Sequence, residues 1–222
     1  MNISENTIKI LKNFANINAN ILVKEGNQLN TISTMRNIIA KATITETFDS
    51  QFGIYDLNEF LSVHDVLNKP DLKLDDSSMI IKDEGGKVKY FYADPSVLVS
   101  PTKEVNMPEA DVTFELTQTN LNKIMKMAAI LKAPDLALEG TIGGPSVLKV
   151  CDKKNVTGNT YDITVSENAT ADYTFYFQVD NMKMIEGDYD VSIASKSIAH
   201  FKNKKEKIEY WIALEQDSTI SK

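Results

Sequence analysis

The chain has few of the side chains that hold metal ions or form disulfide bonds. Among its 222 residues there is one cysteine, Cys151, and there are two histidines, His64 and His200. A single cysteine cannot form an internal disulfide bond, and this set of ligands is too small for a zinc site. Acidic pairs occur near residues 75 and 83, but they lack the spacing of a calcium loop. We therefore expect no bound metal and no cofactor.

Long apolar runs and catalytic motifs are also missing. No apolar segment reaches about 18 residues, and the chain does not open with a basic region followed by an apolar stretch. No glycine-rich loop has the spacing that binds nucleotide phosphates. A carboxylate pair around Asp56 or Asp180 is the one arrangement that could support catalysis. We expect a protein that is not an enzyme, has no membrane partner and works inside a cell.

The chain has fewer basic residues than acidic ones. The chain has 24 Lys and Arg residues against 31 Asp and Glu residues, and its formal net charge is −7. Such a balance argues against a surface coated with phosphate-binding groups. Any contact with DNA must therefore be local and weak. The length allows one large domain or two of about a hundred residues.

Two segments, residues 4–17 and 118–131, share one amphipathic helical pattern. A gapless alignment pairs Ile10 with Ile124 and Ala15 with Ala129, which indicates a duplicated unit of about 114 residues. Each copy has two lysines three positions apart, a spacing that places both ammonium groups on one side of a helix. The pairs are Lys9 with Lys12 and Lys123 with Lys126. An acidic chain thus keeps two basic helical faces.

Alternation of apolar and polar residues predicts half-buried antiparallel strands near residues 38–44, 88–92, 112–116, 173–179 and 208–214. Pro95, Pro101 and Pro108 favour an extended connector. We predict an α+β fold in which helices pack on one face of each antiparallel sheet. The expected domains are an N-terminal domain at 1–93, a connector at 94–110 and a C-terminal domain at 111–222.

Five strings, in order, closely resemble the sliding clamps of T-even-type bacteriophages. They are K-I-L-K-N-F-A-N-I-N-A-N-I-L-V-K-E-G at 9–26, I-Y-D-L-N-E-F-L at 54–61, A-D-P-S at 93–96, D-N-M-K-M-I-E-G-D-Y at 180–189 and A-L-E-Q-D-S-T at 213–219. The resemblance spans almost the whole chain. None of the strings is a catalytic signature.

The resemblance implies a DNA clamp fold in which two similar domains place their helices on the inner face of a closed homotrimeric ring. Such a sliding clamp encircles double-stranded DNA without reading its sequence and tethers the replicative DNA polymerase for processive synthesis. It implies further partners: an ATP-driven clamp loader and, for viral transcription, a late-transcription sigma-like factor and its co-activator. A phage-encoded replication protein of this kind would act in the host cell cytoplasm.

The resemblance also implies where the duplex would be met. The expected DNA-facing residues are Lys9, Lys12, Lys123, Lys126 and Lys183. Lysine suits sliding because its ammonium is mobile and hydrated, whereas the planar fork of arginine favours fixed geometry. Glu5 and Ala129 stand where the family leads us to expect cationic residues. We therefore predict weak direct DNA affinity, with retention resting on ring closure.

The resemblance also implies two sets of residues, one for contacts between subunits and one for binding partner peptides. The resemblance places the subunit junction between the last strand before the connector, at residues 87–92, and a strand of the second domain at about 160–165. The candidates are Val88, Tyr90, Phe91, Tyr161, Ile163 and Val165. A pocket for partner peptides would be lined by Ile32, Ile38, Val105, Ile212 and Leu214. Each of these side chains could equally belong to an ordinary core.

A rival interpretation is a β-rich structural or assembly protein of a virion. Such a protein would also oligomerise through strand edges. The form of the DNA distinguishes the two. A clamp stays on circular DNA and slides off the end of linear DNA, whereas binding of a structural protein does not depend on whether the DNA is circular or linear.

Overall fold

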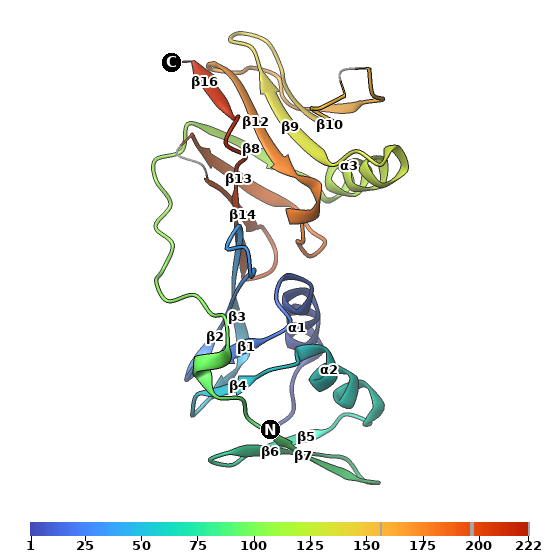
Figure 1. Ribbon diagram of the computed structural model, residues 1–222, viewed down its shortest axis with the longest axis vertical. Helices are drawn as coiled ribbons and strands as arrows, with labels where there is room; N and C mark the ends of the chain where they lie inside the picture. The colour runs from blue at the N-terminus through green and yellow to red at the C-terminus, as the bar shows by residue number, and fades with distance from the viewer. Residues whose placement is uncertain (156, 196–197, 222) are drawn as a thin grey trace. The chain divides into compact units, whose positions relative to one another are not determined.

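The computed structural model describes residues 1–155, 157–195 and 198–221 of the chain (Figure 1). The chain divides into two compact units, Met1–Glu104 and Val105–Lys222. The predicted N-terminal domain lies within the first unit and the predicted C-terminal domain within the second, while the predicted connector includes the boundary between them.

The first unit is built from short antiparallel ladders. Strand β1 (Ile21–Val23) pairs with β4 (Phe52–Ile54), and β2 (Gly26–Ile32) pairs with β3 (Ile38–Phe48). A separate sheet has the order β5 (Asp71–Leu74), β6 (Ser78–Lys82) and β7 (Lys87–Phe91). The strands predicted near 38–44 and 88–92 are confirmed. Along the first part of β3 buried and partly exposed residues alternate, as a strand with one buried face requires.

Two helices pack against each other in the first unit. Helix α1 (Glu5–Ile17) begins at Ser4, whose hydroxyl accepts a hydrogen bond from the Thr7 amide. Helix α2 (Leu57–Val66) begins at Asp56, whose carboxylate accepts one from the Glu59 amide. Both caps satisfy amides that lack partners within the helix. A short 3-10 turn, η1 (Pro95–Val97), follows β7.

The second unit holds two antiparallel arrays of strands. One array has the order β11 (Tyr161–Ser166), β10 (Ser146–Cys151), β9 (Asp135–Gly140), β12 (Asp172–Gln178) and β16 (Thr219–Ser221). The other runs through β15 (Ile208–Ala213), β14 (Ile198–Asn203), β13 (Tyr189–Ala194) and β8 (Val112–Leu116). The strands predicted near 112–116, 173–179 and 208–214 are therefore confirmed.

Helix α3 (Gln118–Leu131) lies against β10 and β11 in the second unit. It is capped by Thr117 and ends at Lys132, which adopts a left-handed conformation. Leu121, Ile124 and Ala128 form its buried stripe. This unit also contains η2 (Val179–Asn181), a single 3-10 turn. Few helices on antiparallel sheets make the fold α+β, as predicted.

A glutamate from the sheet fixes the first turn of α1. Glu46, on β3, accepts a hydrogen bond from the Thr7 hydroxyl at 2.6 Å and another from the Ser4 amide. Burial alone would raise the pKa of Glu46, but these hydrogen bonds favour the ionised form more strongly, and the pKa is lowered. A carboxylate at a helix N-terminus also complements the helix dipole. Glu46 thereby sets where α1 begins on the sheet.

Replacing Glu46 with alanine should lower the free energy of unfolding by about 1–2 kcal/mol near neutral pH, because the Thr7 hydroxyl and the Ser4 amide lose their acceptor. Since the folded-state pKa is depressed, this stabilisation is present above the pKa of an unfolded glutamate, about 4.3, and is lost as the pH falls through the folded-state pKa. Urea denaturation across a pH series measures it. Thr47→Ala, at an exposed position of the same strand, is the matched control. Equal losses in the two variants would contradict the assignment.

Candidate nucleic-acid interface

The exposed stripe of α1 carries two lysines and one acid. Glu5, Lys9, Lys12 and Asn16 are exposed and follow helical spacing along one face. The opposite face holds Phe14 and the other buried residues of the helix. The stripe is therefore the surface that α1 offers to a partner.

Lys12 is engaged by a neighbour on α2. Its ammonium lies 2.7 Å from Asp65 Oδ2 and 3.0 Å from Asp65 Oδ1. This hydrogen-bonded pair holds the pKa of Asp65 below its usual range. His64 Nδ1 lies 3.9 Å from Asp65 Oδ1, yet burial lowers the pKa of His64 and the charge of Lys12 lowers it further, which favours the neutral imidazole.

The corresponding stripe of α3 carries lysines and no acid. Thr119, Lys123, Lys126 and Ile130 are exposed and occupy the positions equivalent to those of the α1 stripe, 114 residues further along. Over the ranges that the structure describes, neither Lys123 nor Lys126 has an ion-pair partner. Lys183 is exposed just beyond η2. Hydrated ammonium groups of this kind attract phosphates without reading bases.

The two strands predicted to form a subunit junction both lie at sheet edges. Strand β7 is the last strand of the β5-β6-β7 sheet, and β11 is the last strand of its five-stranded array. Phe91 has 65% of its surface exposed, and the Lys89 ammonium lies 4.9 Å from the centre of its ring. The other candidates, Val88, Tyr90, Tyr161, Ile163 and Val165, are partly buried. Each edge leaves one side of a strand available for pairing.

Tyr90 is fixed to the start of α2. Its hydroxyl donates a hydrogen bond to the Asp56 carbonyl at 3.2 Å, and its ring makes an edge-on contact with Phe60. Burial, together with the nearby charges of Glu59 and Asp56, raises the pKa of Tyr90 to about 12. Its phenol is therefore neutral at physiological pH. The contact ties β7 to the helix that carries Asp65.

The residues predicted to line a partner pocket are mostly interior. Ile38 and Ile212 are almost completely buried, Ile32 and Leu214 are buried, and Val105 is partly exposed. Such burial is also what an ordinary core requires, which was the alternative left open by the sequence. Their part in a partner pocket therefore stays a prediction.

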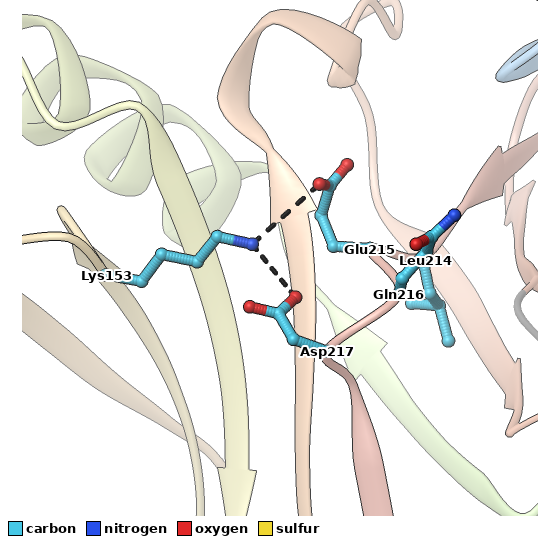
Figure 2. Close-up of a pocket in the computed structure, with 5 residues that line it drawn as sticks. All are labelled: Lys153, Leu214, Glu215, Gln216 and Asp217. Atoms are coloured by element: carbon cyan, nitrogen blue, oxygen red, sulfur yellow. Dashed lines mark hydrogen bonds and ion pairs between the residues drawn. The ribbon is translucent and has the colours of Figure 1, made fainter.

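The structure adds a feature that sequence reasoning missed. A shallow pocket in the second unit is lined by Lys153, Leu214, Glu215, Gln216 and Asp217 (Figure 2). The Lys153 ammonium lies 2.9 Å from Asp217 Oδ1 and 3.8 Å from Glu215 Oε2. Dashed lines in Figure 2 mark both pairs. The sequence gives no sign of these pairs, because more than sixty positions separate the partners.

Lys153 holds the segment that leads into β16. Only 19% of its side chain is exposed, and its ammonium lies 5.1 Å from the centre of the Tyr176 ring. Burial alone would lower the pKa of Lys153, but the hydrogen bond to Asp217 and the neighbouring carboxylates outweigh it and raise the pKa. Strand β16 pairs with β12 over three residues, and the segment before it is also held by hydrogen bonds from the Glu215 amide to the Tyr176 carbonyl and from the Tyr176 amide to the Ser218 hydroxyl.

Replacing Lys153 with alanine should free the 215–217 segment and speed hydrogen exchange of the β16 amides, because the ion pairs and the ring contact are lost together. The expected cost in unfolding free energy is about 1 kcal/mol. Hydrogen exchange with mass spectrometry checks it. Lys154→Ala, at the exposed neighbouring position, should leave the β16 amides unchanged. Faster exchange in both variants would argue against a specific role for Lys153.

Within residues 1–155, 157–195 and 198–221, no group of three His, Cys, Asp or Glu side chains could hold an ion. In the same ranges no helix is both long enough and apolar enough to cross a membrane.

Comparison with protein families gives two adjacent matches. Residues 4–100 match the family described as DNA polymerase processivity factor. Residues 113–216 match the family described as gp45 sliding clamp, C terminal. Together the matches include both lysine stripes and both edge strands.

Full-length relatives and solved structures agree with these matches. The chain is 31% identical to the sliding clamp of Enterobacteria phage T4, covering 99% of both chains. It is 28% identical to the sliding clamp of Vibrio phage KVP40, covering 97% of this chain and 99% of the relative.

Among solved structures, the A. fulgidus PCNA with the C-terminal region of FEN-1 bound has a TM-score of 0.71 at 12% identity, covering 98% of each chain. PCNA from Thermococcus kodakaraensis has a TM-score of 0.69 at 13% identity, covering 95% of this chain and 96% of that one. These two structures share the chain's fold.

Proposed function

The chain belongs to the family of phage sliding clamps, which are DNA polymerase processivity factors and not enzymes, and we propose that it performs this function as a closed homotrimeric ring around duplex DNA. In this proposal residues 1–93 and 111–222 are the two clamp domains of each protomer, and residues 94–110 connect them. The ring acts as a mobile tether that keeps the polymerase on its template.

The proposal of a ring rests on two strands, β7 and β11, that each lie at the edge of a sheet. A head-to-tail contact between β7 of one copy and β11 of the next would pair both edges, and such a heterologous contact forms a closed ring when its rotation closes. The exposed side chains support it. Strand β7 offers Lys87 and Lys89, and β11 offers Asp162. Val88, Tyr90, Phe91, Tyr161, Ile163 and Val165 would contribute to the junction.

Sliding requires contacts that prefer no position along the duplex. The proposed contacts are phosphates met by Lys9, Lys12, Lys123, Lys126 and Lys183, all of which are exposed. The net charge of −7 keeps nonspecific attraction to nucleic acid low elsewhere on the surface. Retention then depends on ring closure more than on affinity.

Further partners follow from the family and complete the proposal. An ATP-driven clamp loader would open and place the ring, and a late-transcription sigma-like factor with its co-activator would use it after replication. Partner peptides would insert apolar side chains near Ile32, Ile38, Val105, Ile212 and Leu214, since a few apolar anchors carry most of the energy in such contacts. The site of action would be the host cell cytoplasm.

Replacing Phe91 with glutamate should weaken trimer formation about tenfold or more per junction, because a charge replaces an apolar side chain at the proposed interface. Fold stability should change little, since Phe91 is exposed in the single chain. Native mass spectrometry across a dilution series counts the chains per particle. Met35→Glu, at another exposed apolar residue, is the matched control and should leave the assembly intact. A monomer at every concentration in the unaltered chain would overturn the ring.

Loading the clamp on nicked circular DNA and then linearising it tests topological retention. The unaltered ring should remain on the circle and leave after linearisation, whereas a virion structural protein should bind both forms equally.

The double substitution Lys123→Ala and Lys126→Ala should weaken binding to short duplexes. The slope of log affinity against log salt should become shallower by about 0.9 for each phosphate contact that a protomer loses.

The matched control for that measurement is Lys24→Ala combined with Lys154→Ala, which removes the same charge from exposed positions outside the lysine stripes. An equal loss of affinity in both double variants would remove α3 from the proposed DNA-facing surface. Retention on the circle that survives in all variants would still support a ring held by topology.

A further inference from the structure

We infer that Asp65 acts as an internal substitute for a DNA phosphate at Lys12, so that the two halves of the clamp contact the duplex unequally and α3 carries most of the attraction. This inference rests on the proposed function, because it concerns how the clamp holds the DNA that it encircles. It assigns Asp65 as a positioning residue that acts through Lys12.

The geometry of the pair resembles that of a lysine on a phosphate. Both carboxylate oxygens of Asp65 lie within hydrogen-bond distance of the Lys12 ammonium, at 2.7 and 3.0 Å. The side chains are 49% and 51% exposed, so the pair sits at the surface where a polyanion can reach it. A phosphate would have to displace Asp65 or share the ammonium with it.

A second carboxylate on α1 adds to this effect. Glu5 lies on the same stripe as Lys9 and Lys12. The two lysines of α1 are thus matched by two carboxylates, those of Glu5 and Asp65. His64 adds little positive charge, because burial lowers its pKa and favours the neutral imidazole.

Helix α3 differs along its lysine stripe. It has no acidic residue between Gln118 and Leu131, and its C-cap adds Lys132. Asp188 and Glu186 contact Gln118 at the start of the helix, where they accept hydrogen bonds from its amide and its side chain. Lys123 and Lys126 have no ion-pair partner among the described residues. They can meet phosphates without first losing an internal partner. The duplication therefore places lysines at equivalent positions, but only one copy leaves both of them free for a ligand.

The test is a cycle of variants on the full-length clamp. Asp65→Asn keeps the shape of the side chain and removes its charge, and Asp76→Asn makes the same charge change in the exposed turn between β5 and β6. Lys12→Ala, the combination of Lys12→Ala with Asp65→Asn, and Lys126→Ala complete the set. Fluorescence anisotropy with a short labelled duplex, over a series of low salt concentrations, gives affinity and its salt dependence.

We expect Asp65→Asn to raise duplex affinity about 1.5- to 5-fold for each Lys12 that reaches DNA, the range for an exposed ion pair. The slope of log affinity against log salt should steepen by about 0.9 for each phosphate gained. Both changes should vanish when Lys12 is also replaced. Lys12→Ala alone should weaken binding less than Lys126→Ala does. A merely structural role for Asp65 would alter the urea midpoint but not the salt slope.

Two results would overturn the inference: equal gains from Asp65→Asn and Asp76→Asn, or equal losses from Lys12→Ala and Lys126→Ala. The proposed function is judged separately, by retention of the unaltered clamp on circular DNA. If the clamp is retained but the variants do not separate, the ring stands and the role of Asp65 falls. If the clamp is not retained, the sliding function fails whatever the anisotropy shows.

Discussion

Antiparallel pairing of backbone groups is the constraint on which the rest of this structure depends. Each N–H and C=O in a strand needs a partner, and an open sheet must end in strands that are paired on one side alone. In this chain β7 and β11 are two of those ends. The exposed Phe91 and the lysines of β7 lie along one of them. Water can satisfy the exposed groups of such edges, but the edges also offer a place where another strand can pair, and the proposed ring uses this.

The helices depend on the same sheets for their position. Alone, helices as short as α1 and α3 are only marginally stable in water, so their buried stripes must pack on strands. Glu46 on β3 sets where α1 begins, and the contact of α3 with β10 and β11 sets which of its faces stays exposed. The lysine stripes are therefore placed by packing on the other side of each helix. The packing of the apolar residues thus decides which charged side chains each helix exposes.

Much of the fold could be predicted from local patterns. Alternation located β3, β7, β8, β12 and β15, because one face of each strand is more buried than the other. The helical period located the two lysine helices, α1 and α3. Local patterns say less about short turns such as η2, since the length of a helical segment depends on packing that local sequence does not contain.

The candidate site could be predicted only in part. Helical spacing placed Lys9, Lys12, Lys123 and Lys126 on exposed stripes, and the structure has them there. It could not reveal that Lys12 is paired with Asp65, or Lys153 with Asp217, because both contacts join residues more than fifty positions apart. The residues predicted to line a partner pocket show a second limit of prediction from sequence. Apolar character is shared by core and by binding surface, so Ile38 and Ile212 could not be assigned by type.

The exposed Ile130 marks a difference between the two similar halves. It ends the α3 stripe at the position that Asn16 holds in α1, and 70% of its surface is exposed. Equivalent positions of the two stripes therefore differ in chemistry: the α1 stripe has an acid beside its lysines, and the α3 stripe has an aliphatic residue and no acid. Although the two halves share one helical pattern, a single polypeptide thus presents two different surfaces.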